Sequence, residues 1–130
     1  MSEYLKPVSG RISSRFGNRV HPITKKLTFH NGIDIACPIG TPVFSPVSGK
    51  VTELWDSDRG GKCLAITGID KVRFGFAHLD SRVVRLGDWV VKGDVIARTG
   101  NTGASTGPHL HFTIKIKNEW VDPEKHIKFV

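Results

Sequence analysis

The segment GPHLHFTIKI, residues 107–116, alternates polar and apolar side chains with the two-residue period of a β-strand. One face of such a strand carries Leu110 and Phe112, which are expected to enter the core. The opposite face carries His109 and His111, whose positions along the backbone are about 6.6 Å apart. Both imidazoles can therefore reach into the same pocket.

Short strands and tight turns account for most of the remaining sequence. The 14 glycines and 7 prolines favour turns, and helical periodicity is hard to find. Apolar runs bounded by turn residues predict strands at residues 50–55, 62–67, 71–78, 94–99 and 110–116. Turn-forming segments separate the first three runs, which predicts antiparallel hairpins. We therefore predict a single all-β domain, built mainly on antiparallel sheet with few or no helices.

A glycine pattern further along the chain narrows the architecture. In VVRLGDWVVKGDVIARTG, residues 83–100, Gly87, Gly93 and Gly100 stand between valine-rich runs. This spacing resembles the barrel-sandwich hybrid fold of biotinyl and lipoyl carrier domains. A carrier would also need a lysine at a hairpin tip, usually flanked by methionine, and the only methionine here is Met1. We therefore expect a barrel-sandwich-like architecture without the carrier function.

The chain is basic, with 19 lysines and arginines against 12 acidic residues and a formal net charge of +7. Such a balance attracts polyanions, whether nucleic acid, an anionic bilayer or an acidic cell-wall polymer. The basic residues are scattered, and no aromatic residues interleave with a basic run. A nucleic-acid partner is therefore not expected.

The sequence also lacks the signals of secreted and membrane proteins. The first ten residues contain no apolar run suited to a secretory signal, and nowhere do about 18 apolar residues follow one another. Cys37 and Cys63 are too few for a disulfide framework and too far apart for a CxxC metal pair. We expect no signal peptide, no membrane span and two buried free thiols.

The segment HNGID, residues 30–34, places His30 and Asp34 four positions apart. On a straight strand their Cα atoms would be about 13 Å apart, which is too far for one imidazole and one short carboxylate to share a metal ion comfortably. Helix is disfavoured by the sequence that follows. The chain should therefore bend between them, and Asn31-Gly32 is where it can bend most easily.

A third histidine segment is FAHLD, residues 76–80, in which His78 ends a predicted strand. Alone, His78 would be an ordinary strand histidine. Together, however, the three segments supply four histidines and one aspartate. Two histidines and one aspartate around a metal leave open the fourth position that a catalytic zinc requires.

These motifs resemble those of the lysostaphin-type (LytM-like) zinc endopeptidases, which cleave peptide cross-links or stems in bacterial peptidoglycan. HNGIDIACPIGTPV, FAHL and TGNTGASTGPHLHF match the HxxxD, YxHL-like and HxH motifs in order, and the likeness covers about residues 7–127. Phe76 departs from it, at a position where many relatives have tyrosine. His21 is expected in a structural or groove-edge position, and His126 on the surface.

The resemblance implies a role for each residue of the three motifs. His30, Asp34 and His111 correspond to the ligands of one Zn²⁺ per chain. His78 and His109 correspond to the catalytic pair, one moving a proton between water and the leaving amine and the other steadying the oxyanion. Which of the two takes which role is left open.

We accordingly expect residues 1–130 to form one LytM-like peptidase domain, monomeric, acting on peptidoglycan peptide. The alternative from another class is a catalytically silent scaffold or amidase activator, which would be expected to lack ligands, whereas all five positions are filled. A zinc enzyme with another substrate is a further alternative. Without a secretory signal, such an enzyme would reach the wall during phage lysis, as a virion component, or as a processed fragment of an exported protein.

Overall fold

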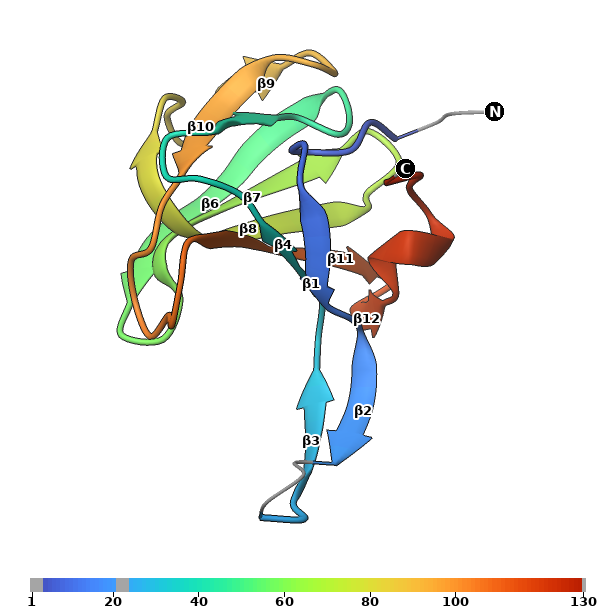
Figure 1. Ribbon diagram of the computed structural model, residues 1–130. Helices are drawn as coiled ribbons and strands as arrows, with labels where there is room; N and C mark the ends of the chain where they lie inside the picture. Colours follow the sequence, from blue (N-terminus) through green and yellow to red (C-terminus); the bar gives the residue numbers. More distant parts are fainter. Residues whose placement is uncertain (1–3, 21–23, 130) are drawn as a thin grey trace.

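The computed structural model describes residues 4–20 and 24–129, which form strands joined by short turns (Figure 1). In the described part of the chain the helical content is a single 3-10 turn, η1 (Pro123–Lys125). No helix among these residues is long and apolar enough to cross a membrane. The strands, in chain order, are β1 (Arg11–Ser14), β2 (Gly17–Val20), β3 (Leu27–His30), β4 (Ile33–Ala36), β5 (Pro42–Phe44), β6 (Gly49–Ser57), β7 (Gly61–Gly68), β8 (Arg73–Arg82), β9 (Trp89–Val90), β10 (Val95–Thr99), β11 (His109–Ile116) and β12 (Glu119–Val121).

Ten of these strands form one sheet with the order β1-β4-β11-β8-β7-β6-β9. Strand β12 adds to β11, while β10 pairs with both β8 and β5 and so folds the sheet back on itself. Strands β2 and β3 form a separate ribbon that projects from this body (Figure 1). Every pairing in the described residues is antiparallel. The prediction of an all-β, mainly antiparallel domain is confirmed.

The five predicted strands correspond to β6, β7, β8, β10 and β11. The predicted limits of β8 are wrong at both ends, because the strand begins at Arg73 and continues to Arg82. The preceding turn takes up Lys71, which has φ of 68°, and is closed by a hydrogen bond from Gly68 N to Val72 O of 3.0 Å. The seven strands that were not predicted are two to four residues long, too short to display a period.

The core lies against the inner face of β11. Leu110, Phe112 and Ile114 are wholly buried, as the alternation predicts. The ring of Phe112 packs between two aromatic rings of β8, with centroid distances of 5.4 Å to Phe76 and 6.3 Å to Phe74. Each such side chain contributes about 1.5–3 kcal/mol through removal of apolar surface from water. This packing holds β11 and β8 in register. The side chains on the outer faces of the two strands therefore also keep fixed positions relative to one another.

Both cysteines are buried and free, as predicted. Cys37 is 6% exposed and Cys63 is 2% exposed. Burial raises the pKa of both thiols, because the thiolate would lose its hydration. Neither side chain is therefore set up as a nucleophile.

The segment before β1 is fastened to the sheet by Tyr4. Its ring meets Phe74 edge-on with a centroid distance of 5.0 Å, and its hydroxyl donates a hydrogen bond of 2.5 Å to Asp70 Oδ2. Leu5 N also donates to Pro46 O at 3.0 Å. Burial, together with the hydrogen bond to Asp70 and the charge of that carboxylate, raises the pKa of Tyr4 to about 12.

We predict that the ultraviolet titration of Tyr4, the only tyrosine of the chain, has a midpoint near 12. The Asp70→Asn variant should lower this midpoint towards about 10, the value of a free phenol. Since the folded-state pKa is the higher one, the contact stabilises the fold fully below about pH 10 and ceases to do so as the pH rises through 12. Equal midpoints in the two proteins would contradict this assignment.

Candidate functional site

One surface cavity of about 750 Å³ lies on the outer face of the sheet, opposite the aromatic core. It is lined by residues of β3, β4, β8, β11 and β12 and by two loops. All five residues proposed from the sequence line this cavity: His30, Asp34, His78, His109 and His111. The structure therefore brings the three motifs together.

Three of these side chains face one another closely enough to hold a single metal ion. His30 Nε2 lies 3.4 Å from Asp34 Oδ1, and His111 Nδ1 lies 2.9 Å from the same oxygen. The three donor atoms are all within 4.8 Å of one another. Two imidazole nitrogens and one carboxylate oxygen are ligands that suit zinc and leave a coordination position open. The residues present therefore fit the expected metal.

The bend predicted at Asn31-Gly32 brings His30 and Asp34 together. Strand β3 ends at His30 and β4 begins at Ile33, with the bend between them. Gly32 serves a second purpose that the sequence does not reveal, since a Cβ there would collide with the Phe112 carbonyl. The glycine thus lets the bend sit directly against β11.

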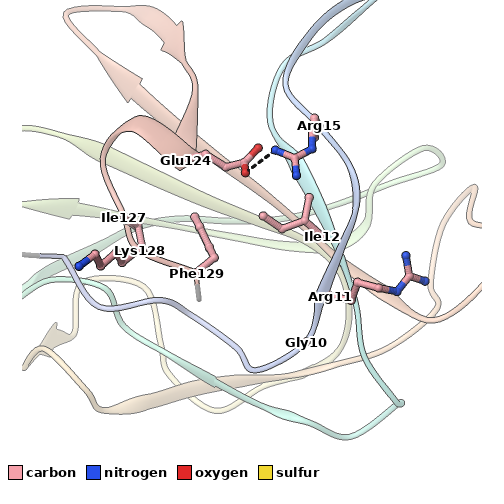
Figure 2. Close-up of a pocket in the computed structure, with 8 residues that line it drawn as sticks. All are labelled: Gly10, Arg11, Ile12, Arg15, Glu124, Ile127, Lys128 and Phe129. Atoms are coloured by element: carbon pink, nitrogen blue, oxygen red, sulfur yellow. Dashed lines mark hydrogen bonds and ion pairs between the residues drawn. The ribbon is translucent and has the colours of Figure 1, made fainter.

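Both histidines of this donor set also make a hydrogen bond through the ring nitrogen that does not face Asp34. His30 Nδ1 donates to the Arg15 carbonyl at 3.0 Å, and His111 Nε2 donates to Asn31 Oδ1 at 2.9 Å. The side chain of Arg15 is joined to Glu124 by an ion pair of 2.8 Å, in a pocket between β1 and the C-terminal segment (Figure 2). Such outer acceptors orient metal-binding imidazoles.

The charge state of Asp34 suits a cation. Burial alone would raise the pKa of this carboxyl, but hydrogen bonds from His111 and His30 outweigh burial and hold the pKa well below its usual range. The same contact with Asp34 raises the pKa of His30 against the effect of burial. The carboxylate is therefore ionised at neutral pH.

The other two histidines form a second pair beside this donor set. The rings of His78 and His109 have a centroid distance of 4.6 Å, and His109 Nε2 lies 3.7 Å from Asp34 Oδ1. His78 Nδ1 donates to the Thr102 carbonyl at 2.7 Å and His109 Nδ1 to the Gly107 carbonyl at 2.8 Å. With the proton held on Nδ1, the neutral ring of each presents Nε2 as a base.

The backbone of His78 is left-handed, with φ of 62°. Phe74 and Phe76 are in the core, so regular alternation would also send His78 inward. The left-handed residue shifts the alternation, which buries Leu79 completely and turns the imidazole to the cavity. A hydrogen bond of 2.7 Å from His78 N to Gly60 O holds this geometry.

The loop before β11 packs against the turn between β6 and β7. Ala104 N donates to the Arg59 carbonyl at 3.0 Å, and the two backbones meet at Gly61 and Gly103, whose φ values are 65° and 78°. A Cβ on either glycine would collide with the other loop. The loop side of the cavity includes Ala104, Ser105 and Thr106.

Sequence reasoning missed several residues of the site. Arg59 and Gly60 come from the β6–β7 turn, Trp120 from β12 and Phe29 from β3, and all four line the cavity. Their positions depend on strand register and loop packing, so no local sequence pattern predicts that they line the cavity. Asn31 was identified only as part of the bend.

Among the described residues, His126 and Phe76 do not line the cavity. His126 is exposed, as predicted, whereas His21 lies outside the described residues. Phe76 is 1% exposed in the core. The departure from tyrosine at this position therefore affects packing and leaves the cavity lining unchanged.

Residues 28–123 match peptidase family M23. The chain belongs to this family. It is 40% identical over 116 residues to the peptidoglycan DD-endopeptidase ShyB of Vibrio cholerae serotype O1. The aligned region covers 88% of this M23 chain and 27% of the relative. The chain spans 31%, 27% and 24% of the length of three of the curated relatives that it matches.

Solved structures of the family agree with the fold. A zinc-containing peptidase from Vibrio cholerae superposes with a TM-score of 0.87 at 38% identity, over 93% of this chain and 39% of that one. The catalytic domain of lysostaphin from Staphylococcus simulans has a TM-score of 0.79 at 33% identity, over 89% of this chain and 90% of that one. The resemblance to the lysostaphin-type endopeptidases is confirmed.

We predict that Gly103→Ala lowers the free energy of unfolding, by about 1–2 kcal/mol for the left-handed backbone alone and further through its collision with the β6–β7 turn. The matched control is Gly107→Ala, because a Cβ at Gly107 meets no atom within 4 Å. Denaturant unfolding monitored by tryptophan fluorescence measures both variants. Equal losses in the two variants would show that the contact between the loops is unimportant.

Proposed function

We propose that this chain is a zinc-dependent endopeptidase that hydrolyses peptide bonds in the stem or cross-bridge of bacterial peptidoglycan. The observation that carries the proposal is the meeting, in one cavity, of a His-Asp-His donor set with a second pair of histidines. The proposal also draws on the relatives, which include named peptidoglycan DD-endopeptidases at 40% and 38% identity.

His30 Nε2, Asp34 Oδ1 and His111 Nδ1 would hold the zinc ion. Zinc bound there would supply Lewis-acid activation of a carbonyl and of a water molecule. The ionised carboxylate of Asp34 offsets the charge of a cation at this position. The side chains of His30 and His111 are 12% and 18% exposed, so both are largely shielded from bulk water.

His78 and His109 would handle the protons. Among the described residues that line the cavity there is no glutamate to serve as a base. The Nε2 atom of one histidine would accept a proton from the attacking water and deliver it to the leaving amine. The other would donate a hydrogen bond to the oxyanion. A ring separation of 4.6 Å allows both to serve one reacting carbonyl.

The described loops would form the substrate groove. Phe29 and Trp120 supply aromatic surface, and Arg59 and the 104–106 loop supply polar groups around the centre. Backbone groups of that loop are suited to hold an extended peptide beside the metal. The net charge of +7 favours attraction to anionic wall polymers.

We further propose that residues 1–130 act as one monomeric peptidase domain, with a core of about residues 7–127. It would meet the wall by one of three routes: as an enzyme released during phage lysis, as a component of the virion, or as a processed fragment of an exported protein. A catalytic domain of the prophage-encoded M23 protein EnpA from Enterococcus faecalis has a similar fold, with a TM-score of 0.79 at 28% identity.

The division of roles predicts two classes of variant. His30→Ala, Asp34→Ala or His111→Ala should lose bound zinc and activity together, because each removes a ligand. His78→Ala and His109→Ala should keep stoichiometric zinc and lose about 100-fold or more of the rate of peptidoglycan digestion. Metal analysis of the purified variants and dye release from labelled sacculi measure the two quantities.

The control for these variants is His126→Ala, which alters an exposed histidine outside the cavity. It should retain both zinc and activity. Zinc binding without any cleavage by the unaltered protein would instead indicate a silent scaffold. Loss of zinc on replacing His78 or His109 would reverse the assigned roles.

The bond that is cut can be predicted from the relatives. Because the curated relatives include named DD-endopeptidases at 40% and 38% identity, we expect cleavage of D-alanyl cross-links to a diamino acid in preference to glycyl-glycine bridges. Mass spectrometry of fragments from peptidoglycans with each defined cross-bridge identifies the bond. Release of glycine-terminated fragments alone would overturn this preference and leave the zinc peptidase proposal intact.

A further inference from the structure

His111 stands between two oxygen acceptors. Its Nδ1 atom is 2.9 Å from Asp34 Oδ1, on the side of the donor set, and its Nε2 atom is 2.9 Å from Asn31 Oδ1. The side chain of His111 is 18% exposed, so most of the ring is shielded from water and its polar atoms need partners within the protein. Asn31 meets this need in a partly buried setting.

The two ring nitrogens of a metal-bound neutral histidine differ in protonation. The nitrogen that binds a metal ion must be deprotonated, and the other nitrogen of the neutral ring then carries the proton. If His111 binds through Nδ1, its Nε2–H needs an acceptor. The Asn31 carboxamide oxygen supplies that acceptor, and a ring flipped by half a turn would lose it.

The place of Asn31 in the chain makes this contact part of the ligand geometry. Asn31 belongs to the bend that joins His30 to β4, where Asp34 lies. The same short segment therefore sets the spacing of two ligands and holds the outer nitrogen of the third. The carbonyl of Arg15 does the corresponding task for His30 through the backbone.

We propose that Asn31 is a positioning residue of the metal centre, whose amide oxygen fixes His111 with Nε2–H outward and Nδ1 towards the metal. The inference rests on the zinc-ligand set proposed above and adds a residue to it. Asn31 acts through His111. Its loss is therefore expected to weaken metal binding before any effect on the chemistry.

The test compares Asn31→Leu, which removes the acceptor at similar volume, with Asn31→Asp, which keeps an oxygen at that place. Zinc affinity of the metal-free proteins is measured by competition with a chromophoric chelator. Asn31→Leu should bind zinc about 10- to 100-fold more weakly. Asn31→Asp should bind at least as tightly as the unaltered protein. Asn18→Leu, at an exposed position of β2, is the matched control and should leave the affinity unchanged.

A second readout follows the imidazole itself. In the zinc-loaded protein, the Nε2–H proton of His111 should give a protected nuclear magnetic resonance signal that Asn31→Leu loses and Asn31→Asp retains. Circular dichroism shows whether Asn31→Leu folds. If it does not, Asn31→Ala, which lacks the same oxygen, is used in its place.

Equal zinc affinity and an unchanged Nε2–H signal in Asn31→Leu or Asn31→Ala would overturn the role of Asn31 alone. Failure of the unaltered protein to bind zinc would refute the ligand set and this inference with it. Weaker binding in Asn31→Leu together with equally weak binding in Asn31→Asp would also refute it, since the oxygen would then be irrelevant.

Discussion

The antiparallel pairing of β4 with β11 is the constraint on which the rest of the molecule depends. Its register sets Asp34 opposite His111 and Ile35 opposite Leu110. The ladder thus places two proposed ligands side by side on one face and two wholly buried core residues on the other. Because side chains alternate across a strand, a slip of one residue would exchange these faces and abolish core and site together.

The site is completed by short segments that approach this ladder from both sides. The bend after β3 brings His30 to Asp34, and β8 supplies His78 through one left-handed residue. Backbone carbonyls and one side-chain amide then hold the outer nitrogens of the four imidazoles. Rigid strands therefore set the donor positions, and loops set the ring orientations. This division matches the needs of a metal site, in which small errors of angle weaken binding.

Backbone packing around the cavity explains where glycine is needed. Gly32 lets the β3–β4 bend lie against the Phe112 carbonyl, and Gly61 and Gly103 let two loops touch at the backbone. The loop before β11 is thereby fixed at the edge of the cavity, although its composition is that of a flexible segment. Preorganisation of such a loop would lower the entropy that is lost when a substrate is ordered beside the proposed metal centre.

The sequence by itself determined the all-β class, the five longer strands and the five residues that meet in the cavity. Local information was sufficient for His109 and His111, which a two-residue period assigns outward, and for the bend at Asn31-Gly32, which follows from residue type. The family resemblance, and not a local pattern, assigned a role to His78. Only the tertiary structure decided which face His78 takes, since its strand alternation points inward until the left-handed backbone reverses it. Tertiary structure alone also placed Asn31, Arg59 and Trp120 at the site. Their positions depend on register and on contacts between distant segments, which no local pattern encodes.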